Sequence, residues 1–124
     1  MPSQEDINEI VRFLFTLQQL NKLYHWNTTS FARHKATDNF AGKLLEITDK
    51  FVEVFMGRYN LKPMVTSLNL KSEYLSDLGI VSLFEVTRRY LENMSNKITD
   101  SDLLNIRDEL LSEVNVILYL FRLN

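Results

Sequence analysis

The amino-acid sequence predicts an all-α fold, in which residues 1–124 form a single domain built as a four-helix bundle. Hydrophobic residues make up 45% of the 124 residues, enough for one domain to bury a core. Only three glycines and two prolines are present, a composition that favours long helices over a sandwich or barrel. Apolar residues also recur at helical spacing along most of the chain. Together these observations indicate helices packed around one core.

The first two predicted helices form a hairpin. Ser3 and Asp6 resemble a capping box, and apolar residues recur at helical spacing after them, so a helix is expected at about residues 4–27. Residues 28–30 interrupt this pattern and supply an N-cap for a second helix that extends to about Tyr59. The two or three residues between the helices allow only an antiparallel pair.

A second hairpin is predicted after a long connection. Residues 62–76 lack helical periodicity and contain Pro63, so they are expected to be irregular. Asp77 is expected to open the third helix, and Thr99 with Asp102 to cap a fourth that runs almost to the end. The second helix is roughly 40 Å long, and the connection can reach about 55 Å. The third helix can therefore start beside the start of the second, as in bundles with one long crossover.

Composition and charge exclude several function classes. The formal net charge is −2 and the chain opens with acidic residues, which gives no electrostatic footprint for nucleic acid or an anionic membrane surface. No signal peptide opens the chain, and the longest apolar runs are too short to span a bilayer. There is no cysteine for a disulfide or thiolate site. We therefore expect a cytoplasmic protein with no nucleic-acid or membrane partner.

Histidine and carboxylate residues gather on the second predicted helix. The steps from His34 to Asp38, Asp49 and Glu53 are four, eleven and four residues, each close to whole helical turns, so all four share one stripe. His25 faces the start of this helix across the hairpin and is expected beside His34. Mixed imidazole and carboxylate ligands suit iron, zinc or manganese better than calcium or magnesium. The sequence therefore predicts a metal site made from these five residues.

One chain cannot complete this site by itself. Asp38 and Asp49 are about three turns apart, roughly 16 Å along the helix, whereas the ligands of one ion lie within a few ångströms. A two-fold partner with its second helix antiparallel would bring Asp49 and Glu53 of one subunit opposite His25, His34 and Asp38 of the other. The sequence thus predicts a homodimer with two identical sites.

Three residues of the first helix are expected around these ligands. Gln18 and Asn21 lie on the same side as His25 and are predicted to support it through hydrogen bonds. Trp26 is assigned to packing in the core or at the dimer interface rather than to a redox role. Each ligand also has a structural interpretation, because a lone histidine is more often structural and an Asp-x3-Glu pair is usually a solvated face.

The pattern His-Trp-x7-His-x3-Asp-x10-Asp-x3-Glu, read from His25, Trp26, His34, Asp38, Asp49 and Glu53, resembles the ferroxidase signature of the Dps-like mini-ferritins. The likeness covers about residues 10–60, and the chain is also similar to small uncharacterised ferritin-like proteins of phages and large DNA viruses. This resemblance implies a ferritin-like bundle, iron sites shared across a two-fold axis, and a higher oligomer, usually a twelve-subunit shell. It implies no catalytic residues separate from the metal ligands.

Two functions remain open at this point. The first is a metal-binding ferritin-like oxidoreductase, a ferroxidase in which iron is oxidised by peroxide or oxygen, with zinc or manganese as alternative metals. The second is a non-catalytic helical dimer, a structural or interaction protein that keeps the fold and an incidental metal site. If the chain is viral, either protein would work in the host cytoplasm.

Overall fold

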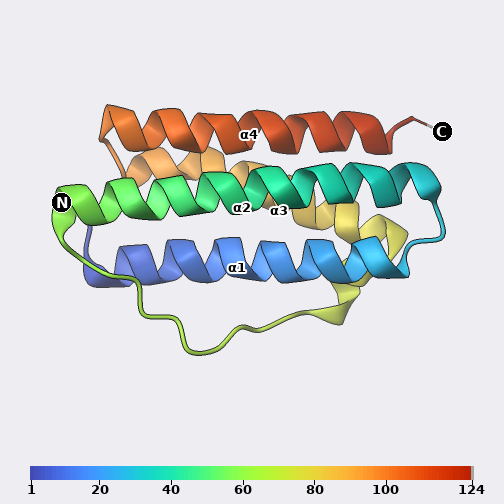
Figure 1. Ribbon diagram of the computed structural model, residues 1–124, viewed down its shortest axis with the longest axis horizontal. Coiled ribbons are helices and arrows are strands. Elements are labelled where there is room, and N and C mark those ends of the chain that lie inside the picture. The colour runs from blue at the N-terminus through green and yellow to red at the C-terminus, as the bar shows by residue number, and fades with distance from the viewer. Residues whose placement is uncertain (124) are drawn as a thin grey trace.

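The computed structural model describes residues 1–123 and contains four long helices arranged as a bundle (Figure 1). These helices are α1 (Gln4–Asn27), α2 (Phe31–Tyr59), α3 (Asp77–Asn93) and α4 (Ser101–Phe121). Two short 3-10 helices flank α3, namely η1 (Ser72–Leu75) and η2 (Met94–Asn96). Residues 1–123 contain no strand, and no helix among them is both long and apolar enough to cross a bilayer. The predicted all-α class with four helices is confirmed.

The starts of α1 and α2 follow from side-chain caps. Ser3 Oγ accepts a hydrogen bond from Asp6 N at 3.2 Å, and Asp6 Oδ2 accepts one from Ser3 N at 2.8 Å. This is the predicted capping box, which satisfies two backbone donors that the first turn leaves free. Ser30 caps α2 with a single hydrogen bond, which its hydroxyl oxygen accepts from Arg33 N at 3.2 Å.

The predicted cap of the fourth helix is wrong. The residue before α4 is Asp100 rather than Thr99, and its side chain makes no capping hydrogen bond. The Asp100 carboxylate instead forms an ion pair with Arg58 at 3.1 Å and accepts a hydrogen bond from the Tyr59 hydroxyl. These contacts join the end of α2 to the start of α4, so a tertiary contact replaces the local cap.

Residues 60–76 connect opposite ends of the bundle (Figure 1). Near the start of α1, Met64 N donates a hydrogen bond to Asn8 Oδ1 at 2.7 Å. Near the end of α1, the Tyr24 hydroxyl donates to Asp77 Oδ1 at 2.7 Å. The connection thus runs along α1, and α3 points in the same direction as α2. It is irregular as far as η1, a 3-10 helix that the sequence pattern did not predict.

The core lies between the four helices and is almost entirely apolar. The Phe84 ring contacts Phe40 and Phe121 edge to face, with centroids 5.2 and 5.6 Å apart. Each such side chain contributes about 1.5–3 kcal/mol by leaving water. Since α2, α3 and α4 each supply one of these rings, the cluster fixes their spacing.

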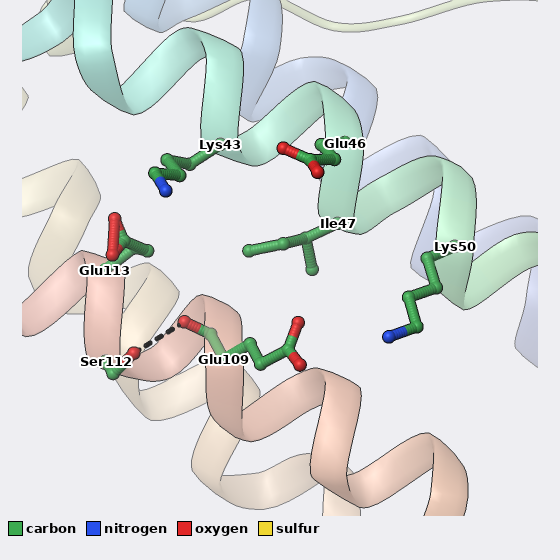
Figure 2. Close-up of a pocket in the computed structure, with 7 residues that line it drawn as sticks. All are labelled: Lys43, Glu46, Ile47, Lys50, Glu109, Ser112 and Glu113. Atoms are coloured by element: carbon green, nitrogen blue, oxygen red, sulfur yellow. Dashed lines mark hydrogen bonds between the residues drawn. The ribbon is translucent and has the colours of Figure 1, made fainter.

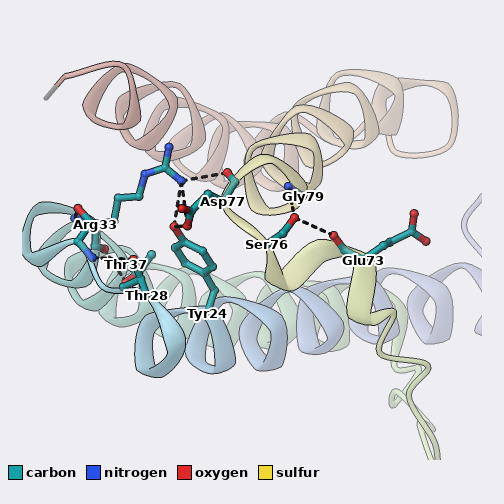
Figure 3. A network of polar contacts seen from close by, with 9 residues as sticks. Tyr24, Thr28, Arg33, Thr37, Glu73, Ser76, Asp77 and Gly79 are labelled. Carbon is teal, nitrogen blue, oxygen red and sulfur yellow. Dashed lines mark hydrogen bonds and ion pairs between the residues drawn. The ribbon is translucent and has the colours of Figure 1, made fainter.

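A polar network joins α1, α2 and the start of α3 at the end of the bundle where α1 ends and α2 begins (Figure 3), called the hairpin end below. Arg33 Nη1 donates to the Tyr24 hydroxyl at 2.9 Å and to the Asp77 carbonyl at 3.0 Å. The Arg33 guanidinium also lies 4.4 Å from the centre of the Phe121 ring. One arginine therefore contacts α1, α3 and α4 from α2, next to the two histidines.

Candidate functional site

The two histidines form a stacked pair next to the turn between α1 and α2. Their ring centroids are 3.9 Å apart and their planes differ by 15°. His25 Nδ1 lies 2.8 Å from the carbonyl oxygen of His34, and His34 Nδ1 lies 2.9 Å from that of His25. A carbonyl oxygen only accepts, so both Nδ1 atoms donate. The predicted proximity of the two histidines is confirmed.

These reciprocal hydrogen bonds determine which nitrogen of each ring is free to bind a metal ion. In a neutral imidazole whose Nδ1 donates, Nε2 keeps its lone pair. Metal-binding histidines commonly donate their other ring N–H to a carbonyl or carboxylate, which fixes the ring orientation. Within residues 1–123, neither Nε2 takes part in a hydrogen bond. The pair therefore has the hydrogen bonding expected of two ligand imidazoles.

Buried polar residues hold His25 in place. Thr37 Oγ1 lies 3.0 Å from His25 Nδ1 and donates to the Arg33 carbonyl at 2.8 Å. Asn21 Nδ2 donates to the Thr37 carbonyl at 3.0 Å, and both residues are fully buried. Asn21 thus supports the histidine through Thr37, a residue that sequence reasoning missed. Thr37 follows His34 by three residues, so helical spacing alone could have placed it beside the histidines.

The other two predicted neighbours lie further from the histidines. Gln18 Nε2 donates to Thr48 Oγ1 at 3.4 Å, deeper along α2. Trp26 is 68% exposed, with the Lys22 ammonium 5.8 Å from its ring centre. Of the two packing roles considered for Trp26, the core is excluded and an interface remains a prediction.

The predicted carboxylates lie on the exposed side of α2. Asp38 lines a hollow of about 390 Å³, together with Gln18, Lys22, Ala41, Gly42 and Leu45. Asp49 lines a second hollow of about 260 Å³, which shares Gln18 and Leu45 with the first. The two hollows therefore form one groove between α1 and α2, called the α1/α2 groove below. Glu53 is exposed one turn beyond Asp49.

One chain brings only part of the predicted site together. The two imidazoles are in contact, while Asp49 and Glu53 lie about three to five turns along α2 from His34 and Asp38. Among residues 1–123, no group of three or more histidine and acidic side chains is placed to hold a metal ion. A site divided between two chains would not be visible within one of them.

The middle of the α1/α2 groove contains an exposed leucine beside a helical glycine. Leu45 is 64% exposed, and a Cβ added at Gly42 would meet nothing within 4 Å. Glycine inside a helix lowers the stability of the helix by about 1 kcal/mol relative to alanine. Gly42 is therefore favourable only if another segment packs closely against this point of α2. Three pairs of residues are equally spaced about the point between Lys43 and Leu44: His34 with Glu53, Asp38 with Asp49, and Gly42 with Leu45.

A different hollow of about 310 Å³ lies between α2 and α4 (Figure 2) and is called the α2/α4 hollow below. In Figure 2, the Lys43 side chain is directed toward Glu113, and the Lys50 side chain toward Glu109. Glu46 lines the same surface. Lysines next to each carboxylate compete with a metal ion for the negative charge. This surface has the character of a charged, solvated helix face.

Comparison with known proteins gives a family but no activity. The model of a family of unknown function (DUF5856) matches residues 25–121. The chain belongs to this family. The matched region begins at His25 and contains the histidine pair together with α2, α3 and α4. No curated protein and no solved structure gives a significant match. The function therefore has to be inferred from the chemistry of the site.

Proposed function

We propose that this protein is a ferritin-like, metal-binding ferroxidase whose iron sites are shared between two copies of the chain. The order of the helices supports the ferritin-like part of the proposal. The antiparallel pair α1 and α2 is joined to the antiparallel pair α3 and α4 by residues 60–76, which run the length of the bundle (Figure 1). Bundles with one long crossover have this connectivity.

The stacked histidine pair is the main observation behind the metal site. His25 and His34 each use Nδ1 for a backbone carbonyl and keep Nε2 for a ligand. Asp38 follows His34 by one helical turn and adds a negative charge on the same stripe. Two neutral nitrogens and one carboxylate are an incomplete set for a divalent ion, so further oxygen ligands are required.

A second copy of the chain would supply the missing ligands. If the α2 helices of two copies pack antiparallel with their centres at Lys43 and Leu44, Asp49 and Glu53 of one copy face Asp38 and His34 of the other. In the same register, Leu45 of each copy faces Gly42 of the other, where the helix surface is open. The exposed leucine and the open glycine thus support the register that also pairs the ligands.

Ferrous iron would be the substrate of such a site. The carboxylates neutralise the charge of the ions, and the imidazoles hold them while leaving a position for the oxidant. Each ferrous ion gives up one electron, and a peroxide molecule accepts two electrons and two protons and is reduced to water. The protein would thereby consume an oxidant before it forms radicals.

A non-catalytic dimer is the second candidate, and Lys22 is the observation in its favour. Lys22 lines the α1/α2 groove beside Asp38, at the level that Asp49 of a second copy would reach. An ammonium there would neutralise the buried carboxylates without a metal ion. In that case the same dimer would form with the metal site empty or only incidentally filled.

Anaerobic titration with ferrous iron separates the two candidates. The purified protein is stripped with a chelator, titrated with Fe²⁺, and then exposed to peroxide or oxygen while ferric iron is followed by absorbance. We expect saturable binding at two equal sites per dimer, and oxidation much faster than in buffer alone. The Glu46→Gln/Glu109→Gln variant in the α2/α4 hollow is the control and should behave like the wild type. A dimer with no saturable binding would favour the non-catalytic candidate, and a monomer would remove the basis for both.

A further inference from the structure

The hairpin end of the bundle exposes a cluster of large apolar side chains. Phe31 is the first residue of α2 and is 76% exposed, and Leu78 is the second residue of α3 and is 85% exposed. The last turn of α1, the last turn of α4 and the residues that follow α4 add the remaining members, which are Trp26, Tyr119, Leu120 and Leu123. Arg33 of α2 contacts the other three helix ends, through hydrogen bonds to Tyr24 of α1 and Asp77 of α3 (Figure 3) and through the Phe121 ring of α4.

The fold does not require these side chains. Each is more than a third exposed, so it contributes little to the core, and polar residues would serve equally at the first turn of a helix. Single exposed apolar residues are normal, but several gathered at one end of a small domain indicate a binding surface. The apolar cluster contains none of the proposed metal ligands, although Trp26 adjoins His25 and the neighbouring Lys22 also lines the α1/α2 groove.

Positive charge surrounds the apolar cluster. Lys35 and Arg122 are exposed at this end, and Lys22 lies beside the Trp26 ring. Together with Arg33 they give four cations, against the three carboxylates of Asp38, Asp77 and the nearby Glu73. This end is thus positive although the whole chain has a net charge of −2. The overall charge, an average over the chain, gave no indication of this local excess.

We propose that the hairpin end docks on an anionic lipid surface. Tryptophan and tyrosine favour the boundary between headgroups and acyl chains, and leucine and phenylalanine favour the region just below it. Lysine and arginine bordering such residues interact with anionic headgroups. The protein would adsorb through its tip without inserting a helix, which agrees with the absence of a membrane-spanning helix in residues 1–123.

A second copy of the chain fits this surface less well. Contact between two hairpin ends would bring like charges together. A head-to-tail contact would pack the apolar cluster of one copy against the opposite end of another copy. At that end, the described residues contribute only Met1 and nearby Met64 as exposed large apolar side chains. An anionic lipid surface complements both the apolar residues and the cations.

Trp26, the only tryptophan of the chain, reports directly on this docking. The wild-type protein at fixed concentration is mixed with vesicles of phosphatidylcholine alone, or of equal parts phosphatidylcholine and phosphatidylglycerol. We expect a blue shift of Trp26 fluorescence and co-sedimentation with the anionic vesicles only, both reversed by high salt. No shift with anionic vesicles would overturn the proposal, as would equal binding to both vesicle types.

Paired variants test the two parts of the surface. Phe31→Ser/Leu78→Ser should reduce the vesicle partition coefficient at least about tenfold, whereas Met64→Ser, at a similarly exposed apolar residue near the opposite end of the bundle, should leave it unchanged. Lys35→Gln/Arg122→Gln should reduce it about twentyfold, and Lys43→Gln/Lys50→Gln should not. Circular dichroism checks that each variant keeps its helices.

A different outcome would assign the surface to a second copy of the chain. In that case the wild type would not bind vesicles but would self-associate in light scattering, and Phe31→Ser/Leu78→Ser would abolish the self-association.

Discussion

The two long sides of α2 both present carboxylates, but their neighbours differ. In the α2/α4 hollow, Glu46 and the carboxylates of α4 lie among Lys43 and Lys50 (Figure 2). In the α1/α2 groove, Asp38 and Asp49 flank an exposed leucine and a glycine, and the histidine pair adjoins one end. The first side alternates two lysines with three glutamates, whereas the second has one lysine, Lys22, beside its two aspartates and has an uncovered apolar centre.

This difference separates a solvated surface from a surface that requires a partner. Exposed ion pairs of mixed sign contribute at most about 1 kcal/mol and need nothing further. A stripe of carboxylates beside open apolar surface becomes favourable only when cations and a second apolar surface cover it. The number of acidic residues is similar on both sides, so their neighbours, and not their number, distinguish the two.

The largest expected effect is on metal affinity. Asp49→Asn with Glu53→Gln should weaken iron binding by at least about a hundredfold, because it removes the oxygen ligands that the second copy supplies. Helicity should be unchanged, since both side chains are exposed. The matched variant Glu46→Gln/Glu109→Gln should bind iron like the wild type. Calorimetric titration under anaerobic conditions measures both, and equal losses in the two variants would remove the distinction between the sides.

The next effect is on the stability of the metal-free protein. His25→Ala should lower the free energy of unfolding by about 2 kcal/mol, because it removes a buried ring together with its hydrogen bond to the His34 carbonyl and its contact with the Thr37 hydroxyl. Glu46→Ala on the other side should change it by less than about 0.5 kcal/mol. Urea denaturation followed by circular dichroism gives both values. A negligible effect at His25 would argue against the hydrogen bonds described here.

A substitution at Gly42 should have opposite effects on the monomer and the dimer. Gly42→Leu should stabilise the isolated chain by up to about 1 kcal/mol, because leucine is a better helix former and the site is open. It should also prevent dimerisation, because the added side chain meets Leu45 of the second copy. Gly57→Leu is the control, at an equally open glycine near the end of α2. Light scattering over a dilution series that shows the same dimer in both variants would place the interface elsewhere.

The smallest effect concerns Asp6, a carboxylate whose partners lie in its own chain. A hydrogen bond from the Ser3 backbone lowers the pKa of Asp6; the Ser3 hydroxyl and Lys97 lower it further, against the opposing effect of partial burial. The stabilisation is therefore present above the ordinary pKa and is lost as the pH falls through the lowered value. Asp6→Asn should cost less than about 1 kcal/mol at neutral pH and nothing in strong acid. Thermal melts at both pH values check this, with Glu92→Gln, at an exposed residue outside the proposed interface, as the control.

Much of the fold could be predicted because helices repeat at a fixed spacing. The capping box at Ser3 and the short turn at residues 28–30 determined the first hairpin, and the turn length alone placed His25 beside His34. The cap of α4 could not be predicted, because Asp100 is engaged by Arg58 and Tyr59 from a distant part of the chain. The 3-10 helix η1 was missed because four residues show no period.

The candidate site could be predicted only as a list of residues on a stripe. Helical spacing aligned Asp38 with Asp49, but the significance of Gly42 and Leu45 appeared only when the packing of α1 and α4 showed which side of α2 stays open. Thr37 became relevant only through its contact with His25. Whether the two halves of the site meet depends on a second chain, whose position one sequence does not determine.

Mixing two inactive variants tests most directly whether the site is shared. One variant is His34→Ala/Asp38→Ala, which leaves the buried His25 in place, and the other is Asp49→Ala/Glu53→Ala. Each homodimer should be inactive, because every site lacks one half. After co-refolding in equal amounts, half of the dimers should be mixed and each mixed dimer should contain one intact site, so ferrous oxidation should recover to about a quarter of the wild-type level. Activity that stays at the level of the separate variants, although mass spectrometry detects mixed dimers, would contradict a site shared between two chains.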